Sequence, residues 1–147
     1  VYLEGVRATG EALQMLIDGL EQLDEPTVLI FVGDHFPSMR AEGNIYDALG
    51  IGSENCSILY EQPALVWSNT ELDESLYPRD MFSVFYLMPL TCKAAGLPLD
   101  AFYETVLSQM DEKKVYTSIF MDEDDRSEPL DLLTYDRIVG ENYTGTR

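Results

Sequence analysis

The sequence predicts an α/β fold in which a few mostly parallel strands are flanked by helices. Residues 27–32 (TVLIFV) form a continuous, largely β-branched apolar run, which is typical of a strand covered by helices on both faces of a parallel sheet. A helical pattern precedes this run across a short turn that contains a proline, and helix–turn–strand is a unit of layered α/β folds. The 147 residues can bury a core, and residues 1–147 are expected to form a single domain.

The first helix is predicted from the spacing of apolar side chains over residues 2–23. The segment Asp24–Pro26 ends this helix, because proline disfavours helical geometry in the residue before it. Four side chains follow the i, i+3, i+4, i+7 pattern of an amphipathic helix: Leu13, Leu16, Ile17 and Leu20.

Shorter signals predict the remaining elements. Residues 36–60 read as an irregular segment with a short helix around residues 44–49. Asp80 is a candidate N-cap of a helix that ends at Gly96, with a kink or break at Pro89. The other predicted elements are strands over Ala64–Trp67 and Val115–Met121 and helices over Leu99–Met110 and Glu128–Val139.

The chain is strongly acidic, with 27 Asp and Glu against 9 Lys and Arg and a formal net charge of −18. This charge repels nucleic acids and anionic membrane surfaces, so we expect neither as a direct partner. An ordinary solvated surface is the simpler interpretation of the acidity. Cys56 and Cys92 follow no metal or redox spacing and are expected to be free thiols. No apolar run approaches the roughly 20 residues that span a bilayer.

The candidate site is the Asp34-His35 dipeptide, which follows the predicted buried strand and contains the only histidine of the chain. In open α/β sheets, ligands bind at the carboxyl ends of the strands. A carboxylate oxygen and an imidazole nitrogen at such a place can ligate a divalent metal for phosphate or sulfate ester chemistry. The alternative is that Asp34 caps the next turn and His35 makes an ordinary structural hydrogen bond. Two ligands also fall short of the three or more that a catalytic metal normally uses.

Three other candidates have simpler interpretations. Arg40 follows the dipeptide closely and could approach a phosphate, but such an arginine more often pairs with surface carboxylates. The run Asp122–Asp125 lacks the alternation and the glycine of a calcium loop and is expected to be a solvated turn. Trp67 ends a predicted strand and is expected in the core or in the wall of a crevice.

Five motifs of the chain resemble the lipoteichoic acid synthase-like sulfatases of the alkaline phosphatase superfamily, in the order in which that family carries them. The segment Gly33–Met39 (GDHFPSM) resembles the signature GDH-[LF]-P-[AS]-[LM]. Gly10 is a departure, because relatives often carry an Asp there. Residues 2–23 match the helix that the family places before this signature, and residues 61–69 match its P-x-x-[IV]-W-S-N strand. Residues 82–99 match its S-x-x-Y-L-x-P…AGL-P-L helix, and residues 135–143 match its terminal YD-x-[IL]-x-G-x-x-Y.

The resemblance implies an alkaline phosphatase-like (sulfatase) layered fold, of which this chain would be the C-terminal portion. In that family a divalent ion, usually manganese, is held by a Glu, the nucleophilic Thr and the Asp-His pair. The resemblance therefore assigns Asp34 and His35 as metal ligands, with magnesium or zinc as other possible ions. A carboxylate oxygen and a neutral imidazole suit such ions, and the ion would activate the Thr hydroxyl and offset charge on the phosphoryl group.

The remaining machinery of that family lies upstream of the matched region. Its Glu ligand, its Thr, and its substrate-binding His and Arg have no counterpart here, so no catalytic residue is assigned. Thr9 and Thr27 belong to the first helix and to the start of the strand. The chain is thus expected to supply the Asp-His half of an incomplete metal site and to be inactive alone.

The expected function is that of the C-terminal part of a metal-dependent phosphoglycerol transferase or sulfatase-like enzyme acting on glycerophosphate or related esters at the cell envelope. Its partners would be the upstream half of the same polypeptide and a phospholipid-derived or ester substrate. The parent would be a bacterial protein anchored on the extracellular face of the membrane, and the piece itself would be soluble. Exposed strand edges would favour self-association. The alternative is a non-catalytic interaction or structural module that keeps the superfamily fold.

Overall fold

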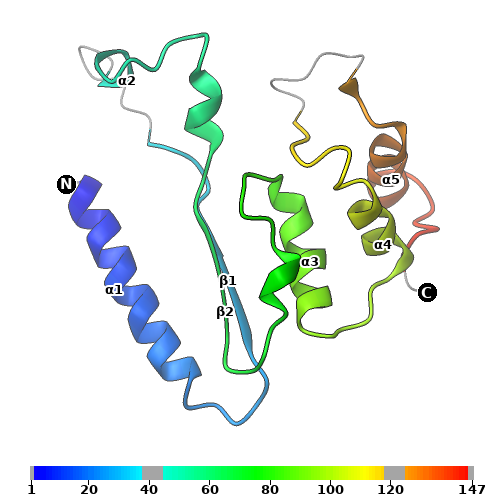
Figure 1. Ribbon diagram of the computed structural model, residues 1–147, viewed down its shortest axis with the longest axis horizontal. Helices are drawn as coiled ribbons and strands as arrows, with labels where there is room; N and C mark the ends of the chain where they lie inside the picture. Colours follow the sequence, from blue (N-terminus) through cyan, green and yellow to red (C-terminus); the bar gives the residue numbers. More distant parts are fainter. Residues whose placement is uncertain (1, 38–44, 118–124, 146–147) are drawn as a thin grey trace. The chain divides into compact units, whose positions relative to one another are not determined.

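The structure is a computed structural model that describes residues 2–37, 45–117 and 125–145. It contains two compact units, residues 1–71 and residues 72–147, whose elements follow the chain order shown in Figure 1. Within the described ranges, no helix has both the length and the apolar character needed to cross a membrane.

The first unit begins with helix α1, Tyr2–Leu20, which confirms the predicted helix. Its residues Leu13, Ile17 and Leu20 are half-buried, as expected for the apolar stripe of an amphipathic helix. Leu16, from the same stripe, is 48% exposed. Helix α1 contains no fully buried residue, so its apolar face is only partly covered.

Strand β1, Val28–Val32, pairs with strand β2, Ala64–Ser68, in an antiparallel two-stranded sheet in which Val28 lies opposite Ser68 and Val32 opposite Ala64. The prediction of mostly parallel strands is therefore wrong for the strands that the structure describes. A parallel pair needs a crossover, usually a helix, and the described part of this connection carries only the short turns α2, Ile45–Ala48, and η1, Cys56–Tyr60.

The prediction that β1 is buried on both faces is also wrong. All five residues of β1 are half-buried, because this two-stranded sheet does not supply the two covering layers that a continuous apolar strand normally has. The predicted positions of both strands are confirmed, as is the short helix within residues 44–49.

Asn69 ties the turn after α1 to the end of β2. Its side-chain oxygen accepts a hydrogen bond from the Thr27 backbone N–H at 2.8 Å. Its amide nitrogen donates to the backbone oxygens of Leu23 at 3.1 Å and Glu25 at 3.0 Å. These bonds hold the start of β1 in register with β2 at the end of the sheet away from Asp34.

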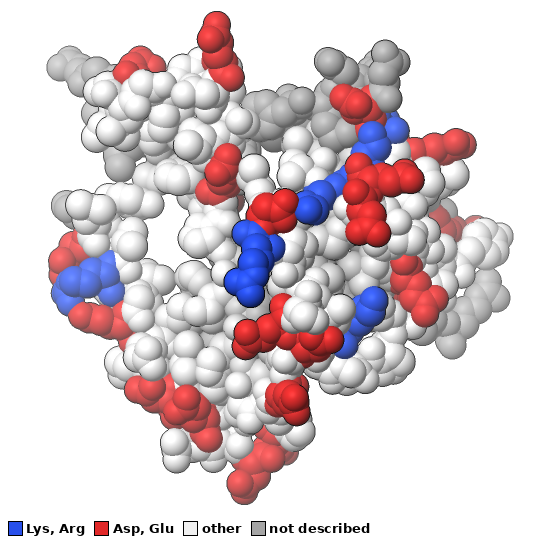
Figure 2. Space-filling model, in the orientation of Figure 1, with Lys and Arg blue, Asp and Glu red and all other residues white. Residues whose placement is uncertain are grey.

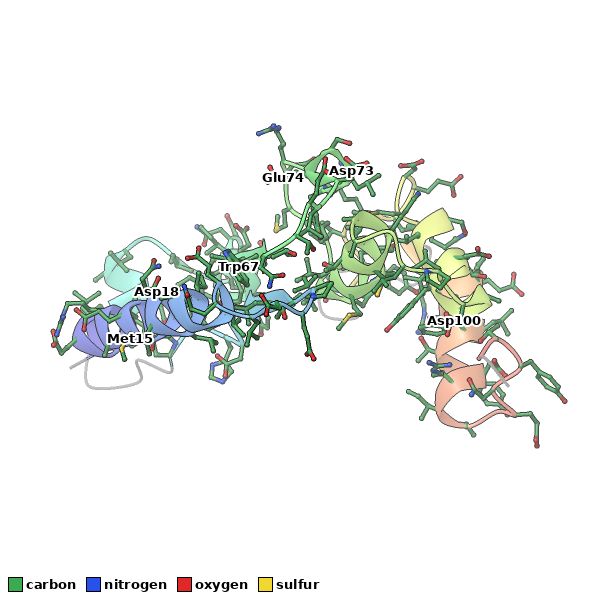
Figure 3. All side chains as sticks on the ribbon, turned by 90° about the horizontal axis from the view of Figure 1, so that it is seen from below. Met15, Asp18, Trp67, Asp73, Glu74 and Asp100 are labelled. Atoms are coloured by element: carbon green, nitrogen blue, oxygen red, sulfur yellow. The ribbon has the colours of Figure 1, made fainter. Side chains whose placement is uncertain are left out.

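The second unit is helical and has its own apolar core. Its elements are η2 (Glu74–Leu76), η3 (Val84–Tyr86), α3 (Leu87–Ala94), α4 (Ala101–Ser108) and α5 (Glu128–Ile138). Asp73 and Asp100, labelled in Figure 3, cap η2 and α4 by accepting backbone N–H bonds from Ser75 and Tyr103. The core consists of six buried side chains: Tyr86, Leu90, Val106, Met110, Leu130 and Leu133.

The helix predicted to start at Asp80 begins later. Its first part is the tight turn η3, and α3 follows directly, so that Pro89 lies in the first turn of α3. In a first turn the missing proline N–H has no intrahelical acceptor to lose, so α3 continues through Pro89 without the break predicted there. Asp80 does not cap a helix and instead pairs with Lys114 at 3.0 Å. Gly96, with φ of 69°, follows the helix as predicted.

The predicted strand Val115–Met121 is wrong in its described part, because residues 115–117 are not in a strand. Tyr116 explains the difference. Its backbone N–H donates to the Ser83 hydroxyl oxygen at 2.7 Å, and that hydroxyl donates to the Tyr116 backbone oxygen at 3.0 Å. A side chain thus satisfies the groups that a neighbouring strand would have paired. Residues 118–121, together with Arg40 and most of Asp122–Asp125, lie outside the described residues.

Candidate metal-binding site

The predicted pair Asp34 and His35 lies one residue beyond the end of β1, after Gly33. The two side chains are strongly exposed, at 85% for Asp34 and 74% for His35. The expected location at the carboxyl end of a strand is confirmed, although this strand is half-buried and antiparallel.

Backbone hydrogen bonds orient both side chains. One carboxylate oxygen of Asp34 accepts the His35 backbone N–H at 2.7 Å. The Nδ1 atom of His35 lies 2.9 Å from the backbone oxygen of Phe36. Since a carbonyl oxygen only accepts, this bond requires a proton on Nδ1, and in the neutral imidazole the lone pair available to a metal is then on Nε2.

The two remaining ligand atoms lie close enough to share one ion. Nε2 of His35 is 3.5 Å from Oδ2 of Asp34. Two ligand bonds of about 2.1 Å at tetrahedral or octahedral angles place their ligand atoms about 3.0–3.4 Å apart. The donor set of one carboxylate oxygen and one imidazole nitrogen therefore fits a divalent transition metal with little adjustment.

These residues make up only part of a metal site. Among the described residues, no group of three or more His, Cys, Asp or Glu side chains could hold a metal ion. Further ligands for an ion on Asp34 and His35 must therefore come from other residues or from water. The pair alone offers two ligands and no nucleophile.

The chain as a whole is rich in carboxylates. Acidic side chains prevail on the face shown in Figure 2, in line with the net charge of −18. Several cations are already engaged: Arg7 bonds Glu4 and Glu11, and the Arg126 Nε atom lies 2.9 Å from Asp131. The first of these bonds lowers the pKa of Glu4. Such a surface attracts cations and repels anionic substrates unless a bound ion offsets the charge.

Gln62 is a residue at this end of the sheet that sequence reasoning missed. It precedes β2, where the Gly33 backbone N–H donates to the Pro63 backbone oxygen at 3.1 Å. Its side chain lies so close to Gly33 that a Cβ atom added there would be 2.6 Å from the Gln62 Oε1 atom. The glycine of the GDH segment was a signal in the sequence, because glycine often marks a close approach.

The terminal motif, residues 135–143, makes structural contacts within the second unit. The Asp136 carboxylate accepts the backbone N–H groups of Tyr143 and Thr144, each at 3.0 Å, and these bonds lower its pKa. The neighbouring Arg137 lies 4.7 Å above the centre of the Phe102 ring. This motif is a structural closure of the second unit.

Comparison with known proteins assigns the chain to a family. The sequence model of the sulfatase family matches residues 1–116, which include the Asp34-His35 pair and exclude α5. A putative cyclic β-1,2-glucan modification protein of Rhizobium meliloti (strain 1021) is 27% identical over 78 residues, which are 46% of this chain and 12% of that protein. The chain thus spans a small part of that relative's length, and no solved structure matches it. Since the family match covers well over half of the 147 residues, the chain belongs to the sulfatase family, with the alkaline phosphatase-like α/β fold that this membership implies.

Proposed function

We propose that residues 1–147 are the C-terminal part of a metal-dependent catalytic domain that transfers or hydrolyses phosphate or sulfate esters. In this proposal Asp34 and His35 hold one side of a divalent ion, preferentially Mn²⁺, and the remaining ligands and the nucleophile come from the rest of the polypeptide. The observation that carries the proposal is the 3.5 Å spacing of His35 Nε2 and Asp34 Oδ2 within the region matched by the sulfatase family.

The role of each residue follows from its chemistry. The bound ion supplies Lewis-acid stabilisation of charge on the ester group. Asp34 contributes a hard oxygen ligand and its negative charge, and His35 contributes the Nε2 lone pair that its bond to Phe36 leaves free. The acidic surface favours the arrival of the cation, which is then the main local positive charge for an anionic ester.

The substrate and location are further parts of the proposal. The motif pattern at residues 33–39 favours a phosphoglycerol transferase that uses a phospholipid-derived donor at the outer face of a bacterial membrane. The name of the Rhizobium relative, a putative cyclic β-1,2-glucan modification protein, favours a glycan as the acceptor. Both proposals concern the whole protein and rest on similarity to its relatives.

The first prediction concerns Asp34. In the full-length protein, Asp34→Ala is expected to lower Mn²⁺ affinity by at least tenfold and to abolish ester transfer or hydrolysis, because one of the two ligands is lost. The unfolding midpoint should change little, since the side chain is 85% exposed. Calorimetric Mn²⁺ titration and assays with phosphatidylglycerol and with an aryl sulfate measure these effects and distinguish the two ester classes.

Asp18→Ala is a matched control, because Asp18 is an exposed carboxylate of the same unit, on α1 (Figure 3). It should leave Mn²⁺ affinity and activity at their original values. Unchanged Mn²⁺ binding in Asp34→Ala would contradict the proposed metal site.

A second candidate function is a non-catalytic module that keeps the family fold. It is favoured by the finding that, among the described residues, no third His, Cys, Asp or Glu side chain joins Asp34 and His35. A full-length protein that binds no Mn²⁺ and has no esterase or transferase activity would support this candidate against the enzyme.

A further inference from the structure

Strand β2, Ala64–Ser68, presents an open edge. It contains neither a charged residue nor a proline, and in the described part of the chain it has β1 as its one neighbour in the sheet. Its first two residues are exposed, whereas all five residues of β1 are half-buried. Natural edge strands are usually protected by charges, prolines or bulges. The unprotected edge of β2 is therefore a surface to which another strand can add.

The hydrogen bonds at the two ends of the sheet show which backbone groups of β2 face outward. The Asn69 N–H donates to the Thr27 backbone oxygen at 3.2 Å, and the Gly33 N–H donates to the Pro63 backbone oxygen at 3.1 Å. In an antiparallel ladder, hydrogen-bonded pairs alternate with pairs that are not hydrogen-bonded. Every second residue between Pro63 and Asn69 therefore turns its backbone N–H and C=O away from β1: Ala64, Val66 and Ser68.

A second copy of the chain fits this edge by symmetry. Val66 is the middle residue of β2, so a two-fold axis beside it brings two β2 edges together with Val66 opposite Val66 and Ala64 opposite Ser68. Every outward-facing backbone group of β2 then meets a partner, because both copies present the same pattern. The same register places Leu65, which is 37% exposed, opposite Trp67 of the second copy. Apolar cross-strand pairs of this kind stabilise a sheet.

We propose that β2 is a self-association site: two copies of the chain join their β2 edges, antiparallel and centred on Val66, to form one continuous sheet in the order β1-β2-β2-β1. The contact consists of backbone hydrogen bonds and uncharged side chains, whereas the net charge of −18 opposes the approach of the two copies. The inference does not depend on the proposed metal site, because neither Asp34 nor His35 takes part in the contact.

Amide hydrogen exchange, followed by nuclear magnetic resonance, tests the site on the 147-residue chain without any substitution. At roughly 1 M salt, where charge repulsion is screened, raising the chain concentration should slow exchange of the outward N–H groups of β2 about tenfold or more. These groups belong to Ala64, Val66 and Ser68. Two sets of N–H groups are internal controls and should change less: those of Leu65 and Trp67, which face β1, and those of Val28, Ile30 and Val32, on the outward side of β1.

Opposite charges at Val66 test the register. In Val66→Lys, and equally in Val66→Glu, the two-fold axis sets like charges directly opposite each other, which is destabilising, so sedimentation velocity should find monomers. An equal mixture of the two variants sets Lys opposite Glu and should form a heterodimer. Leu3→Lys and Leu3→Glu, at an 80% exposed position on α1, are matched controls and should associate like the original chain, alone or mixed. Because Val66 is half-buried, the unfolding midpoint of each variant is measured alongside, and hydrogen exchange decides if a variant does not fold.

Three results would overturn the inference. Protection that rises with concentration at Val28, Ile30 and Val32 instead would assign the contact to β1. A mixture of folded Val66 variants that stays monomeric while the original chain dimerises would exclude the register centred on Val66. Exchange at β2 that does not depend on concentration would show that two copies do not pair there, and would leave this edge to a strand from elsewhere in the whole polypeptide.

Discussion

In the first unit, two side-chain amides make contacts at the ends of the two-stranded sheet, where buried apolar side chains are missing. No described residue of the range 2–71 is fully buried, so hydrophobic burial there is incomplete. Asn69 spans three backbone groups of the turn between α1 and β1, and Gln62 lies against Gly33 at the other end of the sheet. Asn69 thus fastens one end of the two-stranded sheet by hydrogen bonds, whereas at the other end the Gln62 side chain only packs against Gly33.

Asn69 yields a stability prediction. Asn69→Ala removes the acceptor for the Thr27 N–H and both donated bonds and is expected to destabilise the unit by about 1–3 kcal/mol. Asn69→Asp keeps the acceptor but sets a carboxylate oxygen against the Leu23 and Glu25 carbonyl oxygens, which only accept, so its loss should be at least as large. Urea unfolding followed by Trp67 fluorescence reports on this sheet directly, because Trp67 lies within β2. Equal stability of Asn69→Ala and the original chain would contradict the fastening role.

The candidate site was predictable at this scale only in part. The order of Gly33, Asp34 and His35 after an apolar run located the pair, since a strand end is where ligand groups gather. The free Nε2 atom depends on a bond to Phe36, and the packing of Gln62 against Gly33 depends on the approach of two strands. The first is a contact between neighbouring residues that depends on the local backbone conformation, and the second involves residues that lie far apart in the sequence, so apolar spacing predicts neither.

At the scale of helices and strands, local sequence patterns predicted where an element lies in the chain better than which element it pairs with. Helix α1, strand β2 and helix α5, Glu128–Ile138, occur where the pattern placed them. The Ser127 side chain caps α5 by accepting the Leu130 N–H at 3.4 Å, which is local chemistry. Long-range pairing decides that β2 runs antiparallel to β1 and that residues 115–117 do not form a strand. An apolar run in the sequence does not specify such pairing.

Helix α5 offers a matched pair of core and surface leucines. Leu133 is 6% exposed and belongs to the core of the second unit, whereas its neighbour Leu132 is 59% exposed. Leu133→Ala should destabilise the protein by about 2–5 kcal/mol through lost burial and the cavity it leaves. Leu132→Ala should cost about 0.5 kcal/mol or less. Thermal unfolding of the two variants measures the difference, and equal losses would contradict the assigned core.

Across the whole chain, two features are expected to act in opposite directions on self-association. Strands β1 and β2 carry no charged residue, and in the described part of the chain each pairs with one neighbour only. Each strand thus keeps an unpaired edge, which can pair with another copy. The net charge of −18 repels a second copy, and this repulsion is screened by salt over a Debye length of about 30 Å at 0.01 M and about 3 Å at 1 M.

Self-association of the chain is therefore expected to depend on salt. Sedimentation velocity should find monomers near 0.01 M salt and dimers or larger species near 1 M, because screening removes the repulsion while edge pairing remains. Leu65→Lys places a charge on β2, where Leu65 is 37% exposed, and should keep the chain monomeric at both concentrations. Leu3→Lys makes the same change in charge at an 80% exposed position on α1 and should associate like the original chain. Equal association of the two lysine variants would show that the strand edges are not the contact, and association that is independent of salt would show that the acidic surface does not control it.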